Sequence, residues 1–253
     1  MSAIPASAAR KRTFAVTAKR WAYWFSRHWL FVANLFFGLY VGLPWLAPVL
    51  MNLGWTDAGR VIYAFYSTQC HQLPERSYFV FGPKVMYSLS EVQAAWKVTD
   101  NPLILRQFVG NVAMGWKVAW SDRMVSLYTG IFLSGLVFGV FRKRLRPLPL
   151  WAFALLALPM ALDGGTHFLS DFAGIGQGFR DSNAWLAALT DPAFPSTFYA
   201  GDALGSFNSW LRLITGILFA VGGVGVVYPY LESAFADMAH SIEAKLRRAA
   251  LTP

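Results

Sequence analysis

The residues best suited to chemistry lie together in one stretch, Cys70–Ser77, which reads Cys-His-Gln-Leu-Pro-Glu-Arg-Ser. A thiolate and an imidazole are ligands that zinc prefers. Further ligands would have to come from acidic or imidazole side chains elsewhere, namely Asp122, Asp163 or His167. Cys70 is the only cysteine of the chain, so a buried structural thiol is the simpler interpretation. We expect no cofactor, and Cys70, His71 and Asp122 are the candidate ligands if a metal binds.

Nucleophilic catalysis is a second use of a thiol and a histidine. It requires the histidine to face the thiol, which neighbouring residues on one segment rarely do, and an oxyanion hole, for which the sequence gives no sign. Cys70 is therefore a weak candidate for a nucleophile.

The later part of the same stretch is charged. Pro74 followed by Glu75 is typical of a helix start, and Glu75 with Arg76 could form a structural ion pair. Alternatively, Arg76 could join Arg123 and Arg212, which stand beside apolar runs, to bind an anion such as a lipid phosphate. The sequence leaves both interpretations open.

Asp163 follows an uncharged run from Leu148 to Leu162. A charge near the centre of a bilayer costs roughly 2.5 to 3.5 kcal/mol unless it is paired or hydrated, so Asp163 should have a partner. His167 lies four residues later, on the same helical face, which is an arrangement suited to acid–base chemistry. With His71 and Glu75, these two residues are the candidate catalytic groups. The alternative is a structural pair of Asp163 with Arg123 or Arg212.

Composition indicates a membrane protein. The chain has 253 residues, of which 56% are hydrophobic and 14% charged, whereas about a quarter of the residues of a soluble domain are charged. The net charge of +9 comes from basic residues next to apolar runs, as at membrane surfaces, and not from a basic stripe with interleaved aromatic residues. We therefore expect membrane lipid as a partner, and no nucleic acid.

Four apolar runs are long enough to cross a bilayer, at about residues 29–51, 124–141, 148–169 and 213–231. They predict an all-α integral membrane protein with one membrane domain, residues 29–231, and short helices in two long connections. A basic aromatic arm (1–28) precedes this domain, and an amphipathic tail (232–253) follows it. Pro44 and Pro48 predict a kink or an early end of the first span. Gly130, Gly135 and Gly139 favour close helix packing in the second.

Basic residues predict the orientation. Lys and Arg number six in the arm, four in the 142–146 loop and three in the tail, against one in residues 170–210. Since basic residues favour the cytoplasm, both termini should be cytoplasmic in a multi-pass protein of the plasma membrane. The seven basic residues of the 52–123 connection count little, because the bias acts only on short loops. Cys70–Ser77, Asp163 and the arginines would then meet at the extracytoplasmic boundary.

At these residues the chain resembles an uncharacterised family of polytopic prokaryotic membrane proteins, a domain of unknown function. Its Cys-His-x-x-Pro-Glu-Arg-Ser motif matches Cys70–Ser77. Three weaker motifs follow in order, at 121–128, 163–164 and 212–216, so the resemblance covers roughly residues 57–225. Ser121 and Met124 stand where members often have cysteine. If those cysteines serve a metal or a disulfide, this chain has lost it or uses Asp122 instead. The resemblance supplies no reaction.

Two functions are therefore compared. The first is a binding or structural membrane protein, such as a subunit of a complex or a homo-oligomer, whose charged residues form a network at the boundary. The second is an enzyme or carrier for a lipid-linked or anionic substrate at the outer leaflet, with Asp163 and His167 as acid and base. Its arginine clamp would consist of Arg76, Arg123 and Arg212. We favour the first, because no complete catalytic constellation is found in the sequence.

Overall fold

The structure, a computed structural model, describes residues 6–142 and 144–248, and residues 6–12 by their backbone only. The expected arm and tail therefore fall partly outside it, at residues 1–5 and 249–253, as does Lys143 of the basic loop. Within the described residues, four helices are long and apolar enough to cross a membrane. They are α1 (Ala6–Asn52), α5 (Asp122–Phe141), α6 (Leu150–Asp171) and α10 (Phe207–Arg248).

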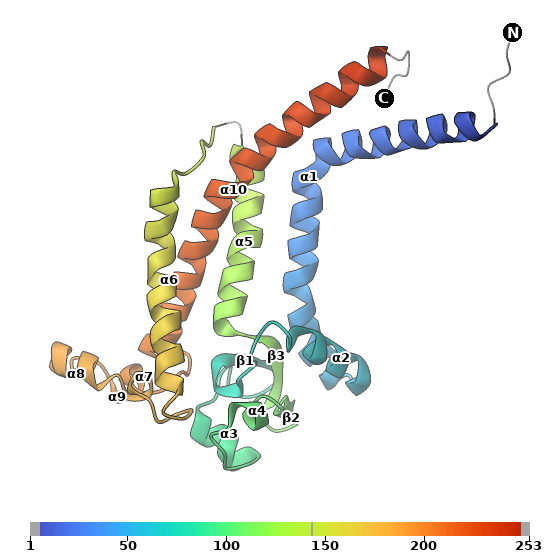
Figure 1. Ribbon diagram of the computed structural model, residues 1–253. Helices are drawn as coiled ribbons and strands as arrows, with labels where there is room; N and C mark the ends of the chain where they lie inside the picture. The colour runs from blue at the N-terminus through green and yellow to red at the C-terminus, as the bar shows by residue number, and fades with distance from the viewer. Residues whose placement is uncertain (1–5, 143, 249–253) are drawn as a thin grey trace, which may run out of the picture.

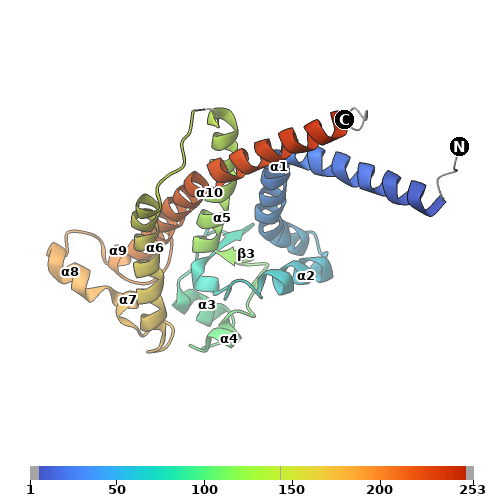
Figure 2. The ribbon, with the colours of Figure 1, turned by 45° about the horizontal axis from the view of Figure 1, so that its top comes forward.

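Helix α10 is at the centre of the bundle, because it contacts each of the other three long helices. The first turns of α1 and the last turns of α10 lie at the same end of the bundle (Figure 1). All the short elements gather at the opposite end, as a second view confirms (Figure 2). They belong to two connections, residues 53–121 between α1 and α5 and residues 172–206 between α6 and α10, called here the first and the second connection.

Helix α1 does not end at its prolines but continues to Asn52. Pro44 has no N–H to donate to the carbonyl oxygen of Tyr40, four residues earlier. The hydroxyl of Tyr66, in α2 (Thr56–Tyr66), donates a hydrogen bond of 2.8 Å to that oxygen. A tertiary contact thus replaces the lost helical bond, which a reading of the local sequence does not foresee.

The all-α expectation is wrong for the first connection, which contains a small sheet. Strand β3 (Gly115–Ser121) lies between β1 (Ser77–Val80) and β2 (Gly110–Asn111), antiparallel to both. Gly115 has a φ of +77°, and a Cβ there would lie 2.3 Å from the carbonyl oxygen of Val80. Glycine is therefore required where the chain turns into β3. The strand leads directly into α5 and fixes the start of that helix.

Short helices complete both connections. The first contains α2, the single-turn η1 (Pro74–Arg76), α3 (Leu89–Ala95) and α4 (Pro102–Leu105). The second contains α7 (Phe179–Ser182), α8 (Ala184–Thr190) and α9 (Ser196–Tyr199). Ser88 accepts a hydrogen bond from the backbone N–H of Glu91 and caps α3.

Aromatic packing joins the first connection to the membrane helices. Trp120 of β3 is completely buried, and its ring contacts the rings of Tyr40, Tyr66 and Tyr128. These residues come from α1, α2 and α5. The sheet is therefore held against the helix ends by its own hydrophobic core, and the charged residues next to it do not have to provide that cohesion alone.

Helices α5 and α10 approach closely through small residues. A Cβ on Gly130 would lie 2.7 Å from the Cβ of Ala220, and one on Gly216 would lie 2.2 Å from the hydroxyl of Ser126. Helix α5 carries Arg123 in its first turn, and α10 carries Arg212 in its second. Close packing thus sets the separation of the charged groups described next.

Candidate functional site

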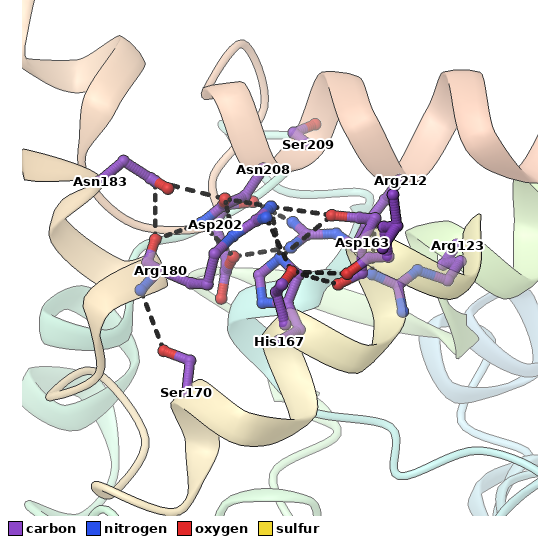
Figure 3. Close-up of polar contacts among 12 residues, drawn as sticks. Arg123, Asp163, His167, Ser170, Arg180, Asn183, Asp202, Asn208, Ser209 and Arg212 are labelled. Atoms are coloured by element: carbon purple, nitrogen blue, oxygen red, sulfur yellow. Dashed lines mark hydrogen bonds and ion pairs between the residues drawn. The ribbon is translucent and has the colours of Figure 1, made fainter. Parts of the chain in front are cut away.

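The site is a network of buried ion pairs, called here the Arg–Asp network. Its members are Arg76, Arg123, Arg180 and Arg212 with Asp122, Asp163, Asp171 and Asp202. It lies where both connections meet the ends of α5, α6 and α10, and most of it is drawn in Figure 3.

Asp202, in the second connection, is the centre of one half. Its carboxylate accepts a bond of 2.7 Å from Nε of Arg76 and one of 2.6 Å from Nη1 of Arg212. Arg76 continues to Asp171 through two parallel bonds, and Arg212 continues to Asp122 at 2.7 Å. Burial alone would raise the pKa of Asp202, but the two arginines outweigh burial and hold it well below its usual range.

Asp163 is the centre of the other half. Its two oxygens accept bonds from different arginines, 2.7 Å from Nη2 of Arg123 and 2.8 Å from Nη2 of Arg180. The sequence offered Arg123 or Arg212 as its partner, and the structure places Arg123 there but sends Arg212 to Asp122 and Asp202. Figure 3 shows the arginines reaching Asp163 from separate segments of the chain.

Asn208, at the start of α10, joins the two halves. Its amide oxygen accepts bonds of 3.2 and 3.0 Å from Arg180, and its amide nitrogen donates to the carboxylate of Asp202 at 3.2 Å. Asn183, between α7 and α8, donates to the amide oxygen of Asn208 at 3.3 Å and to the backbone oxygens of Arg180 and Tyr199, each at 2.7 Å. The whole arrangement is one connected set of bonds.

The network is balanced in charge, because four arginines face four aspartates. Most of these side chains are buried, and Asp202 and Arg212 are each only 3% exposed. Each arginine makes its ion pair within the set. An incoming anion would therefore have to displace a carboxylate from an arginine, or bind the donor atoms that are left over.

Two residues with such donor atoms line a cavity of about 290 Å³. This basic cavity, as we call it, is lined by three arginines and two histidines against two acids, and by residues around Cys70 and Ser121. The charged and imidazole residues are Arg76, Arg123, Arg212, His71, His167, Asp122 and Asp171. Nε of Arg123 and Nδ1 of His167 are buried without a hydrogen-bond partner. His71 is exposed in the isolated chain, and its Nδ1 accepts a bond from the backbone N–H of Leu73.

Asp163 and His167 do not form a hydrogen-bonded acid–base pair. Oδ1 of Asp163 lies 3.8 Å from Nε2 of His167, and Nη2 of Arg180 comes closer to that nitrogen, at 3.3 Å. Since the guanidinium can only donate, Nε2 accepts and the imidazole proton is assigned to Nδ1. His167 thus faces an arginine where an orienting carboxylate was expected.

The residues proposed as metal ligands, Cys70, His71 and Asp122, line the same basic cavity but have other bonding partners. Sγ of Cys70 lies 3.4 Å from the hydroxyl of Ser121, whereas Asp122 is bonded to Arg212. Among the residues that the structure describes, no group of three or more His, Cys, Asp or Glu side chains is arranged to hold a metal.

Glu75 does not pair with Arg76, contrary to the structural pair considered from the sequence. Arg76 turns to Asp171 and Asp202, whereas both carboxylate oxygens of Glu75 are buried without a hydrogen-bond partner. Burial raises the pKa of Glu75 to about 7. Adjacent side chains on the single turn of η1 point in different directions, which explains why sequence adjacency misled here.

Sequence reasoning missed three members of the network, namely Asp171, Arg180 and Asp202, and also Asn208, which joins its two halves. One signal for them was available. The second connection has three acids, Asp181, Asp191 and Asp202, against Arg180 alone, and such an excess requires cations from elsewhere when the acids are buried.

The fold and the site define a mostly helical membrane protein with four candidate spanning helices and a buried ion-pair network at one end of them. Comparison with known proteins agrees with this class. Residues 106–226 match the family described as "Predicted membrane protein (DUF2085)". The matched segment contains the network residues from Asp122 to Arg212 but begins after Cys70–Ser77, so it does not include the Cys-His motif.

The chain is also 27% identical over 183 residues to "Uncharacterized protein MJ1492" of Methanocaldococcus jannaschii. That alignment covers 68% of this chain and 90% of the archaeal protein. No solved structure matches the chain. These similarities indicate a prokaryotic membrane protein and assign no activity to it.

Proposed function

We propose that this chain is a binding or structural protein of the cell membrane, with cytoplasmic termini, whose Arg–Asp network fixes both connections onto the outer ends of the helices. The observation that carries the proposal is the complete internal pairing of four arginines, three of them buried, with four aspartates. Buried charges arranged in this way specify one geometry, because any other arrangement leaves a charge unpaired.

The ion pairs join segments that are far apart in the sequence, which supports a role in holding the fold together. Arg76 ties the first connection to α6 and to the second connection, and Arg212 ties α5 to α10 and to the same loop. A protein that only had to bind a substrate anion would keep its arginines available. Here each guanidinium already has a carboxylate within 2.8 Å.

The partners in this proposal are membrane lipid and another membrane protein or a second copy of the chain. Helix α6 supports this, because its large apolar side chains are exposed along much of its length. Leu155, Leu158 and Leu162 are each at least half exposed in the isolated chain. Apolar surface of this extent is expected to face lipid tails or a neighbouring helix.

Hydrogen exchange of the purified protein in detergent tests the proposed role. Arg180→Gln removes the bonds from α7 to Asp163 and Asn208. We expect the amides of residues 172–206 to lose protection by at least about tenfold, which corresponds to roughly 1.4 kcal/mol of local stability. Lys84→Gln, which removes an exposed ion pair with Glu91, is the matched control. Unchanged protection in Arg180→Gln would rule out this role.

A second function rests on the basic cavity. The unpartnered Nε of Arg123 and Nδ1 of His167 are donors for an anion, which favours an enzyme or carrier for a lipid-linked or anionic substrate. Native mass spectrometry with phosphatidylglycerol and phosphatidylcholine tests it. This function requires that the unmodified protein retains phosphatidylglycerol, the anionic lipid, and that Arg123→Gln no longer retains it. Equal retention of both lipids would exclude it.

A further inference from the structure

Glu75 is the one charged member of the Cys70–Ser77 stretch that the Arg–Asp network leaves unused. Its side chain is 97% buried, and neither of its oxygens has a hydrogen-bond partner. An ionised carboxylate in this state is strongly unfavourable unless a cation compensates it. The surroundings of Glu75 therefore indicate what could bind there.

Glu75 lines a second cavity, of about 300 Å³, which we call the acidic cavity. Its wall includes residues from both connections, and Ser90 on this wall is exposed. Three of the lining residues are acids, namely Glu75, Asp181 and Asp202, and none is a lysine, arginine or histidine. The Arg76–Asp202 ion pair links the two cavities, because Arg76 lines the basic cavity and Asp202 lines this one.

Asp202 is already neutralised by Arg76 and Arg212, but the other two acids are not paired with a cation. Asp181 accepts a bond from the backbone N–H of Gly178 only. Burial first and then Asp202 raise its pKa. The acidic cavity thus has an excess of negative charge in a partly dehydrated space, which favours a positively charged ligand.

The lining also indicates the kind of cation. Among the described residues no ligand set for a metal is found. The lining contains no aromatic residue, whereas sites for quaternary ammonium groups are built from aromatic rings. Acceptors for N–H groups are present, because Ser88, Ser90 and Gln93 line the cavity with the acids. From this geometry we infer that the acidic cavity binds a small primary ammonium compound, with Glu75 as its counterion.

Binding should depend on pH, since Glu75 must be ionised. The charged groups around it are Arg76 on its own turn, Lys117 from β3, and Asp181 and Asp202 from the second connection. Burial raises the pKa of Glu75 to about 7, so an empty site is largely protonated at pH 6. We expect affinity to be about tenfold lower at pH 6 than at pH 8, in proportion to the ionised fraction.

Isothermal titration of the full chain in detergent with ethanolamine at pH 8 tests this inference. The controls are choline and sodium chloride at equal ionic strength. We expect the chain to bind ethanolamine but neither control compound. Binding of ethanolamine should be at least about tenfold weaker in Glu75→Gln. It should be unchanged in Asp191→Asn, which removes an exposed acid outside the cavity. Equal binding to Glu75→Gln, equal binding of choline, or no ethanolamine binding to the unmodified chain would each overturn the inference.

A second variant keeps the test valid if Glu75→Gln folds poorly. Ser90→Trp places a large ring at the exposed wall of the acidic cavity and leaves Glu75 unchanged. It should abolish ethanolamine binding, and undiminished binding to it would also overturn the inference. Neither variant alters the Arg–Asp network, so failure here is distinguishable from failure of the proposed structural role, which the hydrogen exchange of residues 172–206 reports.

Discussion

Asp202 accepts hydrogen bonds from two arginines that lie 126 and 10 residues away in the sequence. Asp202→Asn keeps the shape of the side chain but leaves Arg76 and Arg212 with one negative charge fewer between them. We expect a loss of about 3 to 5 kcal/mol, as found when one partner of a buried pair is removed. Thermal unfolding in detergent measures this loss, with Asp191→Asn as the exposed control. Equal melting temperatures would show that the pair adds no stability.

Replacement of Glu75 should raise the stability of the protein, whereas replacement of Asp202 should lower it. Its pKa of about 7 in the folded chain, above its ordinary value of 4.5, means that the folded state binds more protons between these values. Its contribution is therefore present below pH 4.5 and is lost as pH rises through 7. Glu75→Gln should match the unmodified protein at pH 4.5 and exceed it at pH 8, by up to about 3 kcal/mol.

Unfolding temperatures of both proteins across this pH range provide the measurement. Lys117 must be considered in the same experiment. Burial lowers its pKa to about 7, so its own contribution to stability rises with pH above 7 in both proteins. Glu75 raises the pKa of Lys117, so the difference between the two proteins reports Glu75 together with its effect on Lys117. A difference that is constant across the pH range would contradict the assignment.

Cys70 and Ser121 permit a third test at the level of single residues. Sγ of Cys70 lies 3.4 Å from the hydroxyl oxygen of Ser121. Ser121→Cys should form a disulfide under oxidising conditions, because the two side chains already meet. Loss of free thiol without reductant detects it. Two free thiols after oxidation would show that the two positions do not meet as described.

At the scale of the elements, the α5–α10 contact sets the positions of the charged residues. Gly130→Leu places a side chain where even a Cβ lies 2.7 Å from Ala220. The helices must then separate, at a cost of several kcal/mol. We expect a lower melting temperature and faster hydrogen exchange at the network. Gly223→Ala, where nothing lies within 4 Å of the added Cβ, is the control. Equal effects of the two variants would contradict this role for Gly130.

Some of the helices and strands could be predicted from the sequence, and others could not. Uncharged runs predict the four apolar helices, because apolar length is a property of consecutive residues. The sheet escapes prediction, since β2 has two residues and Ser77 pairs with Ser121 across the rest of the connection. The continuation of α1 past Pro44 depends on the hydroxyl of Tyr66. Contacts between distant segments decide both features, and no local pattern contains them.

The residues of the site also divide into those that the local sequence predicts and those that depend on contacts between distant segments. Arg76, Arg123, Arg212 and Asp163 could be expected to meet, because each stands beside an apolar run in a position that demands a partner. Which arginine meets which aspartate could not be derived, since that choice depends on the fold of residues 172–206. Asp202 is the clearest case, because it is one of several acids in a polar stretch and nothing local marks it as central.

At the scale of the whole molecule, orientation is the main remaining prediction. The distribution of basic residues places the second connection outside and the 142–146 loop inside. Ala193→Cys and Arg144→Cys are exposed sites on these two segments, and the natural Cys70 is buried. In intact cells an impermeant maleimide should label the first variant and spare the second. The reverse pattern would invert the topology.

The bonds of Asp202 also have a consequence for biogenesis. The network joins Arg76 to Asp202 and Asp122 to Arg212, so its outermost partners are synthesised well over a hundred residues apart. Asp122, at the start of α5, pairs with Arg212 of the last helix, so it stays without its partner at the membrane until that helix has been made and inserted. Completion of the network therefore reports that the whole chain has entered the membrane, and incomplete chains expose unpaired charges that quality-control proteases could recognise.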